Sequence, residues 1–206
     1  MPALPAPNGP KAARAGQPGG APTASRVKPR LRGVSHELAF HAALGAGAVL
    51  AVLAPARATL PALIYAFSLV NLLGTSALYH RVTWAPRPRA WMRRADHAAI
   101  FILIAGTYTA FSLVMTTQSR TMLTLAWSAA LLGALQSLFW PRAPRPLFVA
   151  FYLAMGWGVV PLVPALHAAL GSACVVVFIL GGVFYTVGAI IYAVRRPDPW
   201  PAAARF

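Results

Sequence analysis

Only 10% of the 206 residues are charged and 58% are hydrophobic, which leaves too few charges to cover the surface of a soluble domain of this size. Eighteen lysines and arginines face three acids, giving a formal net charge of +15. In a soluble chain this excess would indicate nucleic-acid binding, but here the basic residues separate long apolar segments, which indicates a membrane protein that meets anionic lipid head groups. The single cysteine excludes a disulfide framework and a thiolate metal cluster.

The first 33 residues are rich in proline, alanine and glycine, and they hold six basic residues and no acid. This composition cannot bury enough apolar surface to offset the entropy of ordering, so we expect a disordered basic tail. The segment lacks the apolar core of a secretory signal peptide. An organellar transit peptide is a second interpretation of such an acid-poor leader.

Six long apolar segments follow, separated by short stretches that contain proline and arginine. An apolar segment of about 20 residues forms a helix roughly 30 Å long, which is enough to cross the hydrocarbon core. The two-residue alternation of membrane-spanning strands is missing. The predicted spans are 38–54, 59–79, 97–115, 121–140, 147–163 and 169–194. The sequence therefore predicts an all-α, polytopic membrane helix bundle over residues 34–206.

The distribution of basic residues predicts the orientation of these spans. With a cytoplasmic tail, sixteen of the 18 basic residues lie in inner segments, and only Arg57 and Arg120 lie in outer ones. The positive-inside rule therefore places the amino terminus, and with six spans also the carboxyl terminus, in the cytoplasm. Heavy use of alanine, proline and arginine is typical of GC-rich bacterial genomes, so we expect the bacterial inner membrane.

Polar side chains gather at the inner ends of the first three spans. They are Glu37, His41, Ser76, His80, Asp96 and His97. Glu37 and His41 are four residues apart, as are Ser76 and His80, so each pair shares one helical face. Asp96 and His97 are adjacent, and their side chains point about 100° apart around the helix, so at most one of them faces a given site. Ionisable groups at membrane depth are costly and usually face a cavity, an ion or a partner.

Each of these residues also has a purely structural alternative. Asp96 could stabilise the positive end of its helix or pair with Arg93 or Arg94. His80 could lie at the membrane interface, and Ser76 could serve as a small residue for close helix packing. Four polar positions at one depth on three helices nevertheless favour a shared site.

The same residues belong to a longer set of motifs. In chain order these are Ser35-His36-Glu37 with His41, Ser76-Ala77-Leu78-Tyr79-His80, Asp96-His97-Ala98-Ala99-Ile100-Phe101, Ile104-Ala105-Gly106-Thr107-Tyr108-Thr109, Tyr152-Leu153-Ala154-Met155-Gly156-Trp157 and Gly181-Gly182-Val183-Phe184-Tyr185-Thr186-Val187-Gly188-Ala189. In this order, from about residue 34 to 206, the sequence resembles the hemolysin III branch of the progestin and adipoQ receptor family.

The resemblance implies a seven-helix membrane protein with a zinc ion near the cytoplasmic face. In such proteins zinc is held by the histidine that ends the second helix, here His80, and by two histidines of an H-x-x-x-H motif in a seventh helix. Asp96 would hold or activate a zinc-bound water, with Ser76 beside it as the second catalytic candidate. The family is similar to the alkaline ceramidases, so the implied chemistry is zinc-dependent hydrolysis of lipid amides, in which the metal lowers the pKa of its bound water to about 7 and a carboxylate takes the proton.

The sequence departs from the family pattern at its carboxyl end. It stops at Arg205-Phe206, where the H-x-x-x-H helix would begin, so we expect six helices of seven and an incomplete zinc site. His80 and Asp96 are the expected ligands that are present. Two non-enzymatic functions stay open: a membrane-perturbing cytolysin, as the family name suggests, and a sensor of membrane lipid homeostasis. A secondary transporter is disfavoured because the prolines near 161–164 have no counterpart in the other half.

Overall fold

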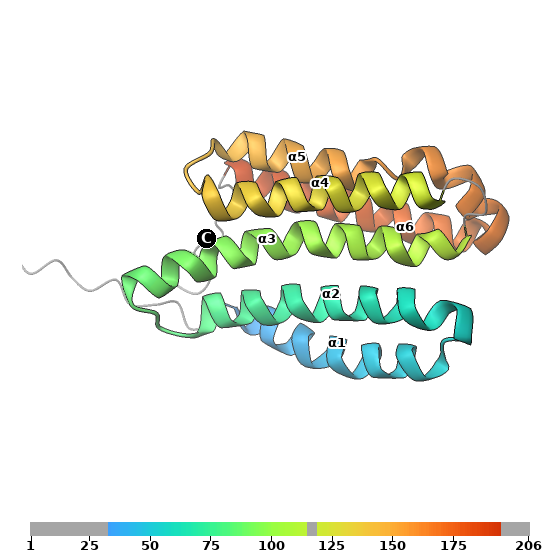
Figure 1. The fold of residues 1–206 in the computed structure, drawn as a ribbon, viewed down its shortest axis with the longest axis horizontal. Coiled ribbons are helices and arrows are strands. Elements are labelled where there is room, and N and C mark those ends of the chain that lie inside the picture. Colours follow the sequence, from blue (N-terminus) through green and yellow to red (C-terminus); the bar gives the residue numbers. More distant parts are fainter. Residues whose placement is uncertain (1–32, 115–118, 195–206) are drawn as a thin grey trace, which may run out of the picture.

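Six long helices follow one another through residues 33–114 and 119–194, which are the residues that the computed structural model describes (Figure 1). They are α1 (Val34–Leu53), α2 (Ala56–Arg81), α3 (Pro86–Phe111), α4 (Ser119–Phe139), α5 (Arg145–Trp157) and α6 (Val163–Val194). Two short 3₁₀ helices, η1 (Ser112–Val114) and η2 (Val160–Leu162), lie between them, and these ranges contain no strand. The predicted helix bundle is confirmed, whereas the predicted tail lies almost wholly outside the described residues.

Large apolar side chains are exposed on every long helix of the described part. Val52 is 82% exposed, Phe139 77% and Phe184 74%, and a surface of this kind is stable only when lipid covers it. Four stretches are long and apolar enough to cross a membrane: 34–53, 56–81, 120–139 and 145–194, of which the last contains both α5 and α6. The protein is therefore an integral membrane protein, and the count of six crossings stays a prediction.

The predicted helix boundaries were wrong at three places. The third helix begins at Pro86 rather than near residue 97, because prolines suit the first helical turn and a charged helix can continue beyond the hydrocarbon. The apolar segment 147–163 is not one helix, since α5 ends at Trp157 and η2 turns the chain. α6 begins earlier than expected and is broken at Gly171, where φ is 78° and ψ is 172°, a conformation that glycine adopts without steric cost.

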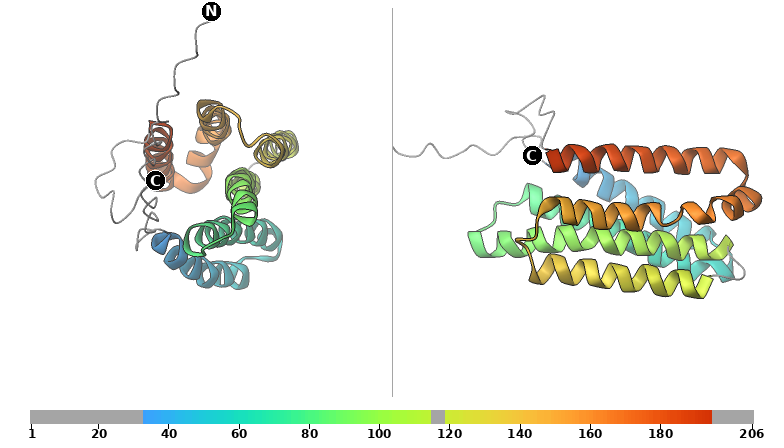
Figure 2. Two further views of the ribbon diagram at one scale, coloured as in Figure 1. Left: turned by 90° about the vertical axis from the view of Figure 1, so that its left-hand side faces the viewer. Right: turned by 90° about the horizontal axis from the view of Figure 1, so that it is seen from above.

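α3 is the central helix of the bundle. It packs along α2 on one side and α4 on the other, while α1 lies on α2, and α5 pairs with α6 (Figures 1 and 2). Glycines permit these close approaches: a Cβ atom added at Gly106 would collide with Ser68, and one added at Gly133 would collide with the ring of Phe101. Phe101 is only 1% exposed and belongs to the main apolar core. Small residues at helix contacts are typical of membrane bundles.

Hydrogen bonds between helices fix α3 further. The Tyr108 hydroxyl donates to the carbonyl of Met155 on α5 over 2.7 Å, and the indole N–H of Trp127 on α4 donates to the Thr109 hydroxyl over 3.1 Å. A polar group without a partner in hydrocarbon costs several kcal/mol, so these bonds favour one arrangement of the helices. These two bonds hold the end of α3, near Phe111, against α4 and α5.

Candidate functional site

Ser76 and Asp96 meet where α2 packs on α3. Ser76, which is 4% exposed, lies within hydrogen-bonding reach of the Asp96 carboxyl, and a hydrogen bond from its hydroxyl favours the ionised carboxylate. Among the described residues no arginine lies within salt-bridge distance of Asp96, so the alternative pairing with Arg93 or Arg94 does not form there. The structure therefore brings the two predicted catalytic candidates into direct contact.

Two histidines accompany this pair. The rings of His36 on α1 and His80 on α2 stack with their centroids 6.0 Å apart and their planes 25° from parallel. His36 also lies close enough to Asp96 to interact with it electrostatically. His36 was missing from the predicted site, although the Ser35-His36-Glu37 motif contains it, because the spacing argument favoured the neighbouring Glu37.

The carboxyl of Asp96 has an unusual environment. Asp96 is the residue directly before the predicted apolar span, which begins at residue 97. Burial raises the pKa of Asp96 above its ordinary value, while the hydrogen bond from Ser76 and the neighbouring His97 and His36 oppose the rise. A half-buried carboxyl that is subject to these opposing influences is suited to accepting and releasing a proton.

The backbone at Gly33 sets the distance between α1 and the end of α2. Gly33 has a φ of 79°, and a Cβ atom placed on it would lie 2.5 Å from the Cβ of His80. Only a residue without a side chain allows both the left-handed turn and this approach. The start of α1 therefore rests directly on His80, which brings the two imidazoles together.

The other three predicted positions lie at the same end but have different partners. Glu37 forms a salt bridge of 2.7 Å with Arg81, and both side chains are a little over 40% exposed. His41 is exposed, with its Nδ1 2.8 Å from the carbonyl of Glu37. His97 bonds through Nδ1 to the carbonyl of Arg93 (2.6 Å) and through Nε2 to the hydroxyl of Tyr192 (2.9 Å). Of the adjacent pair at positions 96 and 97, only Asp96 bonds to Ser76.

Comparison with known proteins agrees with this arrangement of motifs. The model of the family described as Haemolysin-III related matches residues 24–205. The chain belongs to this family. The haemolysin-III related proteins are members of the progestin and adipoQ receptor family, so the resemblance read from the motifs is confirmed.

Two relatives of this haemolysin-III family member are informative. The chain is 37% identical over 135 residues to "Hemolysin-3 homolog" of Bacillus subtilis (strain 168), covering 65% of this chain and 63% of that protein. It is 29% identical over 173 residues to "Hemolysin-3" of Bacillus cereus, covering 77% and 78%. The first match therefore spans just under two thirds of the Bacillus subtilis protein.

The described part of this haemolysin-III family member does not fit a zinc ion by itself. Within residues 33–114 and 119–194, no three side chains of His, Cys, Asp or Glu lie close enough to share a metal. A catalytic zinc generally has three protein ligands and one open position. His80 and Asp96 are only two such ligands and fall short of that number.

Proposed function

We propose that this haemolysin-III family protein hydrolyses an amide bond of a membrane lipid at the Ser76–Asp96 site. The observation that carries the proposal is the hydrogen-bonded pair of the buried Ser76 and the half-buried Asp96, with His36 near Asp96 and His80 stacked on His36. Carboxylates are rare among apolar helices and usually functional there. The site lies at the end of the bundle where the loops hold most of the basic residues, which is the depth of lipid head groups and their linkages.

The chemistry follows from the position of each group. Asp96 takes a proton from a water molecule, and the water oxygen attacks the carbonyl carbon of the amide. The carbon–nitrogen bond then breaks, and a proton passes to the departing nitrogen, so that a fatty acid and an amine are released. Ser76 holds the Asp96 carboxylate in one orientation through its hydrogen bond. The stacked imidazoles of His36 and His80 can hold or deliver the second proton.

A zinc requirement is a separate part of the proposal and rests on the family resemblance. His80 and Asp96 are the ligands that this chain would contribute, and any further ligand would have to come from outside the described residues. The cytoplasmic placement of the site and residence in the bacterial inner membrane are likewise inferred, from the distribution of basic residues and from the composition.

The test is fatty-acid release by the purified chain in lipid nanodiscs. We expect release from lipids with an N-linked acyl chain and not from matched lipids with an ester-linked chain. The assay is run with added zinc and with a chelator, and bound zinc per chain is measured by mass spectrometry in the parent and in His80→Ala. Release that survives the chelator would remove zinc from the proposal, and a lack of release from every amide lipid under both conditions would contradict the hydrolase.

The names of the two Bacillus relatives favour a second candidate, a membrane-perturbing protein. Dye leakage from liposomes distinguishes it from the hydrolase. Leakage that persists in His80→Ala and Asp96→Asn, without fatty-acid release, would support this candidate. If a folded chain causes no leakage and releases no fatty acid, the non-enzymatic sensor of lipid homeostasis is favoured.

A further inference from the structure

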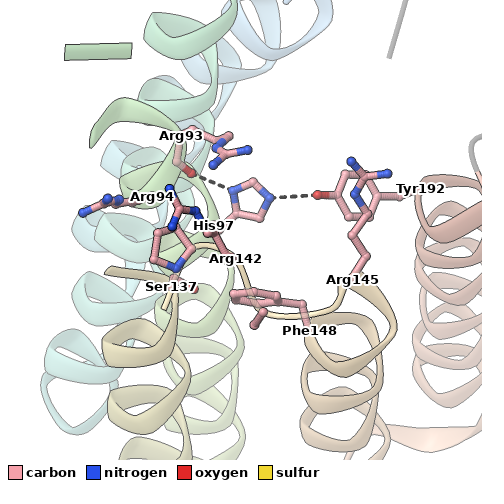
Figure 3. A pocket seen from close by; sticks show the side chains of 10 residues that line it. Arg93, Arg94, His97, Ser137, Arg142, Arg145, Phe148 and Tyr192 are labelled. Atoms are coloured by element: carbon pink, nitrogen blue, oxygen red, sulfur yellow. Dashed lines mark hydrogen bonds between the residues drawn. The ribbon is translucent and has the colours of Figure 1, made fainter. Parts of the chain in front are cut away.

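A second polar feature lies at the same end of the bundle, on the other side of α3. A cavity of about 310 Å³ is enclosed by α3, the turn between α4 and α5, the start of α5, and α6 (Figure 3). Its polar lining includes Arg93, Arg94, Arg142, Arg145, His97 and Tyr192. The arginines come from segments about 50 residues apart in the chain, so their convergence is a property of the fold.

This cavity holds positive charge that no acid in the described residues neutralises. Four arginine residues line it, and none of the acids in residues 33–114 and 119–194 does. The two described acids have other partners, since Glu37 pairs with Arg81 and Asp96 accepts from Ser76. Arg93, Arg142 and Arg145 are exposed, so solvent screens part of their mutual repulsion, and a bound anion would reduce the rest.

Arg94 has a different environment from the other three arginines. The guanidinium of Arg94 stacks on the ring of Trp91, 4.6 Å from its centroid. Its Nε is buried and, in the part of the chain that the structure describes, has no hydrogen-bond partner. The Arg94 side chain points away from the His97–Tyr192 bond (Figure 3), so the guanidinium groups of Arg93, Arg142 and Arg145 are the ones available to a ligand in the cavity.

The walls of the cavity are fixed by His97 and Tyr192. Nδ1 of His97 bonds to the carbonyl of Arg93 over 2.6 Å, and Nε2 of the same ring bonds to the Tyr192 hydroxyl over 2.9 Å. This bond ties α6 to α3 across the cavity, and Figure 3 shows Arg93 and Arg145 on either side of it. Arg145 is also the first residue of α5, and the amino end of a helix attracts anions.

We propose that this cavity binds the phosphate group of an anionic ligand. Guanidinium forks match phosphate oxygens in a bidentate manner, and several of them from separate segments suit a multiply charged oxyanion. The cavity lies beside the apolar helices at head-group depth, where basic pockets between membrane helices bind phospholipid head groups. The proposal does not depend on amide hydrolysis, because neither Ser76 nor Asp96 lines the cavity.

Binding is tested with the full chain in phosphatidylcholine nanodiscs. One arm titrates phosphatidic acid and phosphatidylglycerol and counts retained lipids by native mass spectrometry, and the other adds inorganic phosphate or glycerol phosphate. The site variant is Arg142→Gln with Arg145→Gln. The matched control is Arg87→Gln with Arg89→Gln, which removes the same charge from exposed positions of α3 outside the cavity. A third variant, Arg142→Lys with Arg145→Lys, keeps the charge and removes the guanidinium forks.

We expect retention of an anionic phospholipid, with apparent affinity reduced at least about tenfold in the glutamine site variant and partly in the lysine variant, since each charge-assisted hydrogen bond contributes on the order of tenfold. The control pair should change affinity little. Displacement by soluble phosphate at similar concentration would assign the site to a free phosphate. Equal losses in the site and control variants, or no preference for phosphate anions over phosphatidylcholine, would overturn the proposal. Circular dichroism of each variant verifies that it is folded.

Discussion

Replacing Asp96 with asparagine is expected to lower amide hydrolysis by about 10²–10⁴-fold, the usual contribution of a general base. Asparagine has nearly the same shape and can still accept the hydrogen bond from Ser76, but it cannot take a proton from water. The fold should therefore persist while the rate falls. The measurement is fatty-acid release from amide lipids in nanodiscs, together with thermal unfolding of the same sample.

Glu37→Gln is the matched control, because it neutralises the other described acid at the same end of the bundle. The Glu37–Arg81 salt bridge is half exposed, so its loss should cost no more than about 1 kcal/mol of stability and leave the rate close to that of the parent. An Asp96→Asn variant with the full rate would exclude Asp96 as the base. Equal losses in both variants would show that overall charge at this end, rather than the Ser76–Asp96 pair, controls the reaction.

Gly133→Ala is expected to destabilise the bundle by about 1–3 kcal/mol, the usual cost of overpacking a well-filled core. The added methyl group would collide with the ring of Phe101, which is 1% exposed and has little room to move. Alanine normally favours a helix over glycine by about 1 kcal/mol, so a net loss would show that packing outweighs helix propensity here. Unfolding in mixed micelles of increasing denaturing detergent measures the change.

Gly181→Ala provides the comparison for this effect. A Cβ atom at Gly181 meets no other atom within 4 Å, so only the gain in helix propensity remains and stability should stay level or rise. Adding Phe101→Leu to Gly133→Ala should recover part of the loss by making space for the methyl group. If Gly133→Ala were as stable as Gly181→Ala, α4 would not pack on Phe101 as described.

The apolar segments were sufficient to predict the number of long helices in the described chain, because lipid imposes a strong pattern of length and hydropathy. They did not predict where those helices end. α3 continues through charged residues that a hydropathy criterion rejects, and the break in α6 depends on one glycine, Gly171, whose backbone conformation a composition cannot reveal. Boundaries depend on local backbone geometry, and the bilayer places few constraints on it outside the hydrocarbon.

The candidate site was partly predictable for a similar reason. Ser76 and Asp96 were found because polar residues are conspicuous in apolar helices, and they do meet. The prediction chose Glu37 and His41 on α1, whereas His36 is the residue that lies against His80. The face of α1 that meets α2 depends on the close approach at Gly33, which one-dimensional spacing does not encode. The arginine cavity was missed because its residues were interpreted only as markers of membrane orientation.

The central position of α3 bears on how the protein enters the membrane. From residue 97 to its end at Phe111 the helix is roughly 22 Å long, less than the hydrocarbon thickness, and its preceding turns are charged. Such a segment partitions weakly into lipid when it is alone. We therefore expect that α3 is not released singly during synthesis but waits beside the already inserted α2 until α4 emerges, so that the three helices leave the insertion machinery as one unit.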